Sequence, residues 1–190
     1  LDRSSAASDV YKRQRQSPPC VYTSDMSARR IADSVVEMTE ILLPQHANAL
    51  GSAFGGTIMS WIDICGAICA QRHCGRIAVT AFVDDLEFLA PIRIGDVVRL
   101  HGRMNQAFGS SMEVEVEVRR ERVGDDHLAK CAVARLTFVN IGVDGKPAPV
   151  PTLVLETDED RARAKGADTR RAEPVSYTHL RAHETVLDLV

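Results

Sequence analysis

The stretch Thr57-Ile-Met-Ser-Trp-Ile-Asp-Ile-Cys-Gly-Ala-Ile-Cys-Ala70 decides the fold, and its pattern continues to about Cys74. Its apolar residues lie on every side of a helical wheel. A helix that is apolar all round is a buried helix. The pattern therefore predicts one long helix that other parts of the structure must cover on all sides.

Segments typical of strands flank this helix. One precedes it and ends at Pro44, and four follow it, with short turns between them, at residues 34–43, 79–89, 97–106, 112–119 and 128–141. Short turns favour antiparallel neighbours. We therefore predict an α+β fold, in which an antiparallel sheet of five to six strands wraps around one long central helix. A second layer must come from elsewhere.

Composition limits the classes of function. The chain has 190 residues, 45% of them apolar, and a net charge of −3, which favours one domain with a buried core and no general attraction to nucleic acid or anionic membrane. No apolar run reaches the ~20 residues of a membrane-spanning helix, and no apolar secretory segment is visible, so a cytoplasmic location is predicted. The five cysteines form no C-x-x-C pair, so we predict reduced thiols and no metal site.

The two ends differ from the middle of the chain. Both resemble translated sequencing-adapter sequence, and the C-terminal one follows a charged Arg/Ala/Asp segment. The predicted domain covers residues 18–157. We expect residues 1–17 to be disordered and non-native, and residues 158–190 to be a charged linker and a non-native tail.

Asp63 is the only ionisable carboxylate or base between Thr57 and Ala70. An unpaired carboxylate in an apolar helix is costly, and no Lys or Arg lies three or four positions away. Asp63 is therefore either satisfied by hydroxyl and backbone groups of another element, or it faces a functional cavity. Gly66, on the same helix face, would leave room for a ligand.

Phe54-Gly55-Gly56 opens the helix. Glycines let a ligand approach the backbone, and the first N–H groups of a helix are unpaired donors, which suits an oxyanion hole, although the pair could also be only a tight turn. Asn48, in the preceding loop, is either a turn residue or an amide that holds water or a carbonyl. Gly56 and Asp63 are about 10 Å apart along the helix, so catalysis by both requires two subunits with antiparallel helices.

The stretch from Asn48 to Ile68 resembles the signature of hotdog-fold acyl-CoA thioesterases, in the branch of the cytosolic acyl-CoA thioester hydrolases, YciA-like in bacteria. Residues 83–98, 109–118, 138–140 and 144–151 resemble later segments of the same family. The likeness covers about residues 34–152 in uninterrupted order.

The resemblance implies hydrolysis of a fatty acyl-CoA to the free acid and CoA, with no cofactor. Asp63 would be the general base, with a nucleophilic role left open, Asn48 of the partner subunit would place water or thioester, and the Gly56 N–H would stabilise the oxyanion. The implied assembly is a homodimer, and further a trimer of dimers (hexamer). The expected substrate-binding residues are Phe54, Gly55, Gly109, Ser110, Ser111 and Arg119.

Two alternatives belong to other classes. A hotdog hydratase or dehydratase needs a histidine placed with a carboxylate for proton abstraction, and His46, before the glycine loop, fits this poorly. A non-hydrolytic acyl-CoA binding or sensing protein would keep the pocket but lose the base, whereas Asp63 is present. The chain also lacks the G-x-S-x-G elbow of serine hydrolases.

Overall fold

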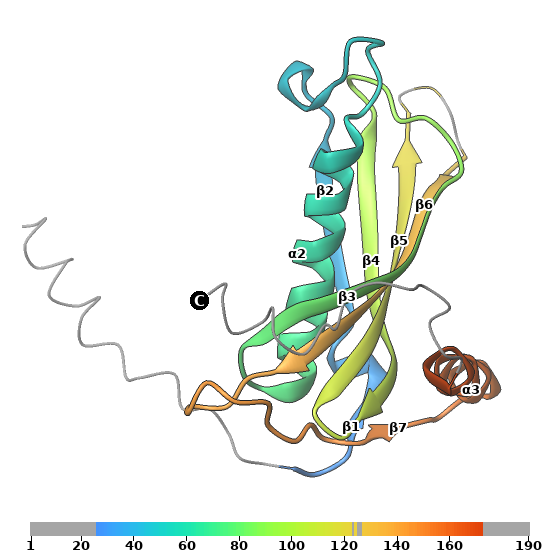
Figure 1. Ribbon diagram of the computed structural model, residues 1–190. Helices are drawn as coiled ribbons and strands as arrows, with labels where there is room; N and C mark the ends of the chain where they lie inside the picture. The colour runs from blue at the N-terminus through green and yellow to red at the C-terminus, as the bar shows by residue number, and fades with distance from the viewer. Residues whose placement is uncertain (1–25, 123, 125–126, 173–190) are drawn as a thin grey trace, which may run out of the picture.

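The computed structural model describes residues 26–122, 124 and 127–172. Its centre is the 20-residue helix α2 (Gly55–Cys74), which lies along one face of a five-stranded antiparallel sheet (Figure 1). The strands pair in the order β2-β4-β5-β6-β3 and are β2 (Val36–Ile41), β3 (Ala78–Phe88), β4 (Val97–Phe108), β5 (Ser111–Glu121) and β6 (Ala129–Asn140). This confirms the predicted hotdog-type α+β fold and its five strands.

Smaller elements complete the described part of the chain. Strands β1 (Arg29–Arg30) and β7 (Leu153–Val154) pair in parallel, apart from the main sheet. Two short 3₁₀ helices, η1 (Ile31–Asp33) and η2 (Pro44–His46), lie on either side of β2. A second α-helix, α3 (Asp158–Ala172), follows β7.

The core lies between α2 and the inner face of the sheet. β5 shows why the sequence folds in this way, because Met112, Val114, Val116 and Val118 point inward and are fully buried. The glutamates between them lie on the other face. Burial of one apolar face is what holds a strand of this pattern in the sheet.

The described part of the chain does not cover the helix α2 on all sides. Met59, Ile64 and Ile68 are 46%, 45% and 36% exposed, and so the prediction of a wholly buried helix is met only on the side that faces the sheet. The edge strand β3 is similarly open, with Phe82 and Val83 both more than 40% exposed. Apolar surface therefore runs from α2 to the edge of the sheet.

The structure differs from the predicted charged linker after residue 157. Residues 158–172 form α3, which lies on the face of the sheet opposite α2 (Figure 1). The helix starts where the Thr157 hydroxyl accepts the Asp160 N–H and the Asp160 carboxylate accepts the Thr157 N–H, a reciprocal cap. Ion pairs with the sheet, such as Arg103 with Asp160, then hold it. The predicted segments 1–17 and 173–190 lie outside the described residues.

Candidate active site

Asp63 lines a cavity of about 400 Å³ between α2 and the strands β3 and β6. The walls are apolar apart from Asp63 and the hydroxyl of Ser60, and consist of Gly56, Met59, Ser60, Ile62, Asp63, Val83, Leu86, Ala134 and Leu136. A single carboxylate in an apolar cavity beside a helix can act on one polar group of an otherwise apolar ligand.

Thr80, on β3, donates a short hydrogen bond from its hydroxyl to Oδ1 of Asp63. The two alternatives predicted for Asp63 are therefore both true. A hydroxyl of another element satisfies the carboxylate, and the carboxylate also faces a cavity. Among the described residues, no group donates a hydrogen bond to Oδ2. The sequence reasoning missed Thr80, although it is the only hydroxyl residue in the strand Ala78–Phe88 that follows the helix.

Gly66 does not leave room for a ligand beside Asp63. A Cβ atom at this position would lie 2.9 Å from two atoms of the Phe138 ring, which fills the space in the core. The missing side chain of Gly66 therefore serves the packing of α2 on β6, and the expectation of a ligand there is wrong.

The first two N–H groups of α2, those of Gly55 and Gly56, have no acceptor among the described residues. The carbonyl of Phe54 accepts the next two, from Thr57 and Ile58, at 2.9 and 3.3 Å. A Cβ on Gly56 would lie 2.5 Å from the Phe54 ring, so any larger residue here would require this exposed ring to move. The two N–H groups can bind an anionic oxygen, helped by the helix dipole.

Asn48 shapes the loop that leads into α2. Its Oδ1 accepts the N–H groups of Leu50 and Ser52 at 2.9 and 3.3 Å, and its Nδ2 donates to the Ser52 hydroxyl at 3.0 Å. Within one chain Asn48 is therefore a turn residue, one of the two alternatives from the sequence. It lies at the N-terminal end of α2, apart from Asp63 in the middle of that helix.

The turn between β4 and β5 lies near the other end of α2, away from the glycine pair (Figure 1). The carbonyls of Gly109 and Ser110 accept the N–H groups of Val150 and Asn140 at 2.8 and 3.0 Å. Ser111 is only 7% exposed, and its hydroxyl accepts a hydrogen bond from Arg171 at 3.0 Å. The predicted binding residues of this turn are thus held in place by their own chain.

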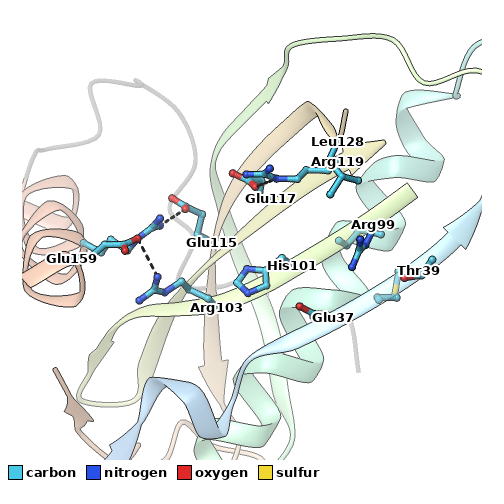
Figure 2. A pocket seen from close by; sticks show the side chains of 13 residues that line it. Glu37, Thr39, Arg99, His101, Arg103, Glu115, Glu117, Arg119, Leu128 and Glu159 are labelled. Atoms are coloured by element: carbon cyan, nitrogen blue, oxygen red, sulfur yellow. Dashed lines mark hydrogen bonds and ion pairs between the residues drawn. The ribbon is translucent and has the colours of Figure 1, made fainter. Parts of the chain in front are cut away.

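Arg119 lies on the face of the sheet opposite α2. It lines a hollow of about 440 Å³ between the sheet and α3, where its guanidinium pairs with Glu117, as Figure 2 shows. Other charges in this hollow also neutralise each other, among them Arg103 with Glu159. The structure therefore does not bring Arg119 together with Asp63 within one chain.

In the part of the chain that the structure describes, no group of three or more His, Cys, Asp or Glu residues is placed to hold a metal ion. No helix among these residues is both long enough and apolar enough to cross a membrane.

Residues 50–127 match the family model of the thioesterase superfamily. The uncharacterized acyl-CoA thioester hydrolase YkhA of Bacillus subtilis is 41% identical over 128 residues, which are 67% of this chain and 74% of YkhA. The cytosolic acyl coenzyme A thioester hydrolase of Rattus norvegicus is 36% identical over 135 residues, 70% of this chain, which spans only 35% of that longer protein.

Solved structures agree with these matches. The acyl-CoA hydrolase of Staphylococcus aureus in complex with butyryl coenzyme A, coenzyme A and coenzyme A disulfide has a TM-score of 0.71 and 34% identity, over 76% of this chain and 88% of that one. Variants of that hydrolase with alanine in place of an asparagine, an aspartate or a threonine are also known. An apo-hexameric acyl-CoA thioesterase has a TM-score of 0.74 and 30% identity, over 76% of this chain and 93% of its own.

Proposed function

Because this chain belongs to the thioesterase superfamily and is an acyl-CoA thioester hydrolase, we propose that it cleaves fatty acyl-CoA in an active site shared by two subunits. The observation that carries this proposal is Asp63, a lone carboxylate in an apolar cavity, held through one oxygen by Thr80. Its other oxygen is left to take a proton from water. No cofactor enters the reaction.

The proposed reaction is a hydrolysis with an oxyanion intermediate. Asp63 removes a proton from a water molecule, whose oxygen attacks the thioester carbonyl carbon. The resulting oxyanion accepts the Gly56 N–H, the C–S bond breaks, and the CoA sulfur leaves and is protonated. The positions replaced in the S. aureus hydrolase have the same separations along the chain as Asn48, Asp63 and Thr80, which supports roles for all three.

Asp63 and Gly56 belong to different subunits in this proposal. They lie seven residues, or about 10 Å, apart along one helix, which is too far for both to contact one carbonyl. A second copy related by a two-fold axis, with the two α2 helices antiparallel, would bring Gly56 and Asn48 of the partner subunit to Asp63. The exposed apolar residues of α2 and the open edge of β3 supply a surface for that copy.

We propose a homodimer as the minimal active unit, and a trimer of dimers as the full assembly. The hexameric state of the similar acyl-CoA thioesterase supports the second part. Phe54 and Gly55, next to the oxyanion donor, and the Gly109–Ser111 turn are proposed to contact the substrate. Arg119, on the other face of the sheet, could contribute only to a substrate bound by a neighbouring copy.

The first experiment measures release of CoA thiol from acetyl-, hexanoyl- and palmitoyl-CoA. For Asp63→Asn we expect kcat to fall by about 10²-fold or more, the usual effect of losing a general base. For Thr80→Val we expect about a tenfold loss, with recovery in Thr80→Ser. Asp85→Asn, which alters an exposed carboxylate of the same strand β3, is the control and should keep full activity. Equal activity of Asp63→Asn and the control would overturn the proposal.

Subunit mixing tests the shared site. Asp63→Asn and Asn48→Ala subunits, each impaired alone, are combined in one oligomer. If each site takes Asp63 from one subunit and Asn48 from its partner, each mixed dimer contains one intact site of two. The mixed dimer then has about half the activity of a wild-type dimer. If both residues act within the same subunit, no site is intact and the mixture stays inactive.

Two other outcomes concern the chemistry. After a single turnover in ¹⁸O-water, a general base leaves the label only in the fatty acid. Label in the Asp63 side chain would show that Asp63 attacked the thioester, and that water then opened the acyl-aspartyl anhydride at the aspartyl carbon. Binding of acyl-CoA without release of thiol by the wild-type chain would favour the binding or sensing alternative.

A further inference from the structure

The face of α2 that lines the Asp63 cavity carries a second polar group, the hydroxyl of Ser60. Gly56, Ser60 and Asp63 are four and three positions apart, so they share one face of the helix, and all three line the cavity. Ser60 precedes Asp63 by less than one turn, about 4.5 Å along the helix axis. The two polar side chains of the cavity are therefore neighbours on one helix.

The Ser60 hydroxyl is not used by its own helix. A serine or threonine inside a helix can donate to the carbonyl four residues earlier, as Thr169 of α3 does to Lys165 at 3.0 Å. Among residues 26–122, 124 and 127–172, by contrast, no group exchanges a hydrogen bond with the hydroxyl of Ser60. This hydroxyl is therefore available to a small molecule in the cavity.

The proposed dimer would enclose this hydroxyl. If Asp63 faces Gly56 of the partner subunit across antiparallel helices, Ser60 faces Met59 of the partner subunit. Both Met59 and Ser60 are exposed in the single chain and would be removed from bulk water by this contact. A buried hydroxyl without a hydrogen-bond partner is costly, and the cavity walls from β3 and β6 are apolar. The hydroxyl therefore needs a polar partner inside the cavity.

We propose that Ser60 is a positioning residue that holds the attacking water beside Asp63. This inference rests on the proposed function, in which Asp63 takes a proton from that water. The water donates one O–H to the free Oδ2 of Asp63 and the other to the Ser60 oxygen. A lone pair of the water oxygen then attacks the thioester carbon, the first proton passes to Asp63, and the second O–H stays with the attacking oxygen.

The test compares Ser60→Ala with Ser60→Thr in the full chain, with hexanoyl-CoA as the substrate. Alanine removes the hydroxyl and is the better helix former, so α2 should persist. We expect kcat of Ser60→Ala to fall about tenfold with KM unchanged, as for the loss of one hydrogen bond that orients the water. Ser60→Thr keeps the hydroxyl and should recover most of kcat. Thr169→Ala, which removes an exposed hydroxyl from α3, is the control and should match wild type.

A double-mutant cycle with Asp63→Asn tests whether both groups act on the same water. Orientation of the water matters only if Asp63 takes its proton, so Ser60→Ala should cost much less than tenfold in the Asp63→Asn background. A further tenfold loss in that background would overturn the proposal, since Ser60 would then act independently. A fully active Ser60→Ala beside an impaired Asp63→Asn refutes only the role of Ser60, whereas a fully active Asp63→Asn refutes the proposed function itself.

Binding without hydrolysis gives an independent readout. S-hexyl-CoA is a thioether that cannot be hydrolysed. In titration calorimetry it should bind wild type and Ser60→Ala with the same Kd, because Ser60 holds the water and not the substrate. Weaker binding by Ser60→Ala would overturn the proposal and make Ser60 a substrate contact.

Subunit mixing tests whether Ser60 serves Asp63 of its own chain. In a dimer of one Ser60→Ala and one Asp63→Asn subunit, each site then lacks one of the two groups, and activity should not exceed that of Ser60→Ala. Recovery to about half of the wild-type activity would mean that Ser60 serves Asp63 of the partner subunit, which would overturn the assignment.

Discussion

Arg170→Met is expected to lower the free energy of unfolding by about 2–3 kcal/mol, because it leaves the buried carboxylate of Glu113 without its ion-pair partner. Glu113 is only 3% exposed and accepts hydrogen bonds from Arg170 Nη2 at 2.5 Å, from Arg170 Nε at 3.3 Å and from Asn105 Nδ2 at 2.8 Å. Without Arg170, the carboxylate keeps only the Asn105 donor. Asp84, whose pKa is raised by burial and further by Glu113, would then face an unbalanced charge.

The magnitude follows from the burial of the pair. Removal of one partner from a fully buried ion pair costs about 3–5 kcal/mol. The Arg170 side chain is 32% exposed, so solvent already screens part of the interaction and water can replace part of it, which lowers the expected loss to about 2–3 kcal/mol. The loss is also limited by the free energy with which α3 binds the sheet, since detachment of the helix would solvate Glu113.

Urea unfolding at a fixed protein concentration measures the effect, in a double-mutant cycle with Glu113→Gln. The glutamine can still accept from Asn105 but carries no charge, so Arg170→Met should cost at least about 1 kcal/mol less in that background. Arg161→Met, which breaks a pair whose side chains are 54% and 99% exposed, is the control and should change stability by less than about 0.5 kcal/mol. Additive effects in the cycle, or a loss from Arg170→Met no larger than that of the control, would refute this reasoning.

Three further outcomes are expected. Gly66→Ala should lower stability by about 1 kcal/mol in thermal unfolding, since the new methyl group meets the Phe138 ring at 2.9 Å while better helix propensity offsets part of the strain, and a more stable variant would contradict this. Burial raises the pKa of the Cys65 thiol to about 11 and that of Cys69 to about 12, so site-resolved alkylation at pH 8 should modify both only after unfolding, and rapid reaction of the native protein would disprove it. Burial lowers the pKa of His73, so its contribution to stability is complete above the pKa of about 6.5 in the unfolded chain and is lost as the pH falls below that value. Between pH 8 and 5, the free energy of unfolding should therefore depend less on pH in His73→Gln than in wild type. The same dependence in both proteins would count against this.

The sequence alone determined the elements and the central residue of the site. The spacing of apolar residues along the chain is a local property. The change from the continuous apolar run of α2 to the apolar–polar alternation of β5 therefore located the helix and the strands within a few residues. Asp63 could be singled out because a charge among apolar residues is costly wherever the chain folds. The glycine pair at the start of α2 was visible for the same kind of reason, since the first donors of any helix are unpaired.

Only the tertiary structure decided the partners of these groups. Thr80 is bound to Asp63 across 17 positions, and the Phe138 ring, rather than a ligand, occupies the space beside Gly66. The charges of α3, which by composition indicate a solvated linker, are balanced by charges on the sheet 48 to 57 positions earlier in the chain. Local periodicity records which face of an element is buried, but the pairing of side chains across a sheet depends on register and topology, which no local pattern contains.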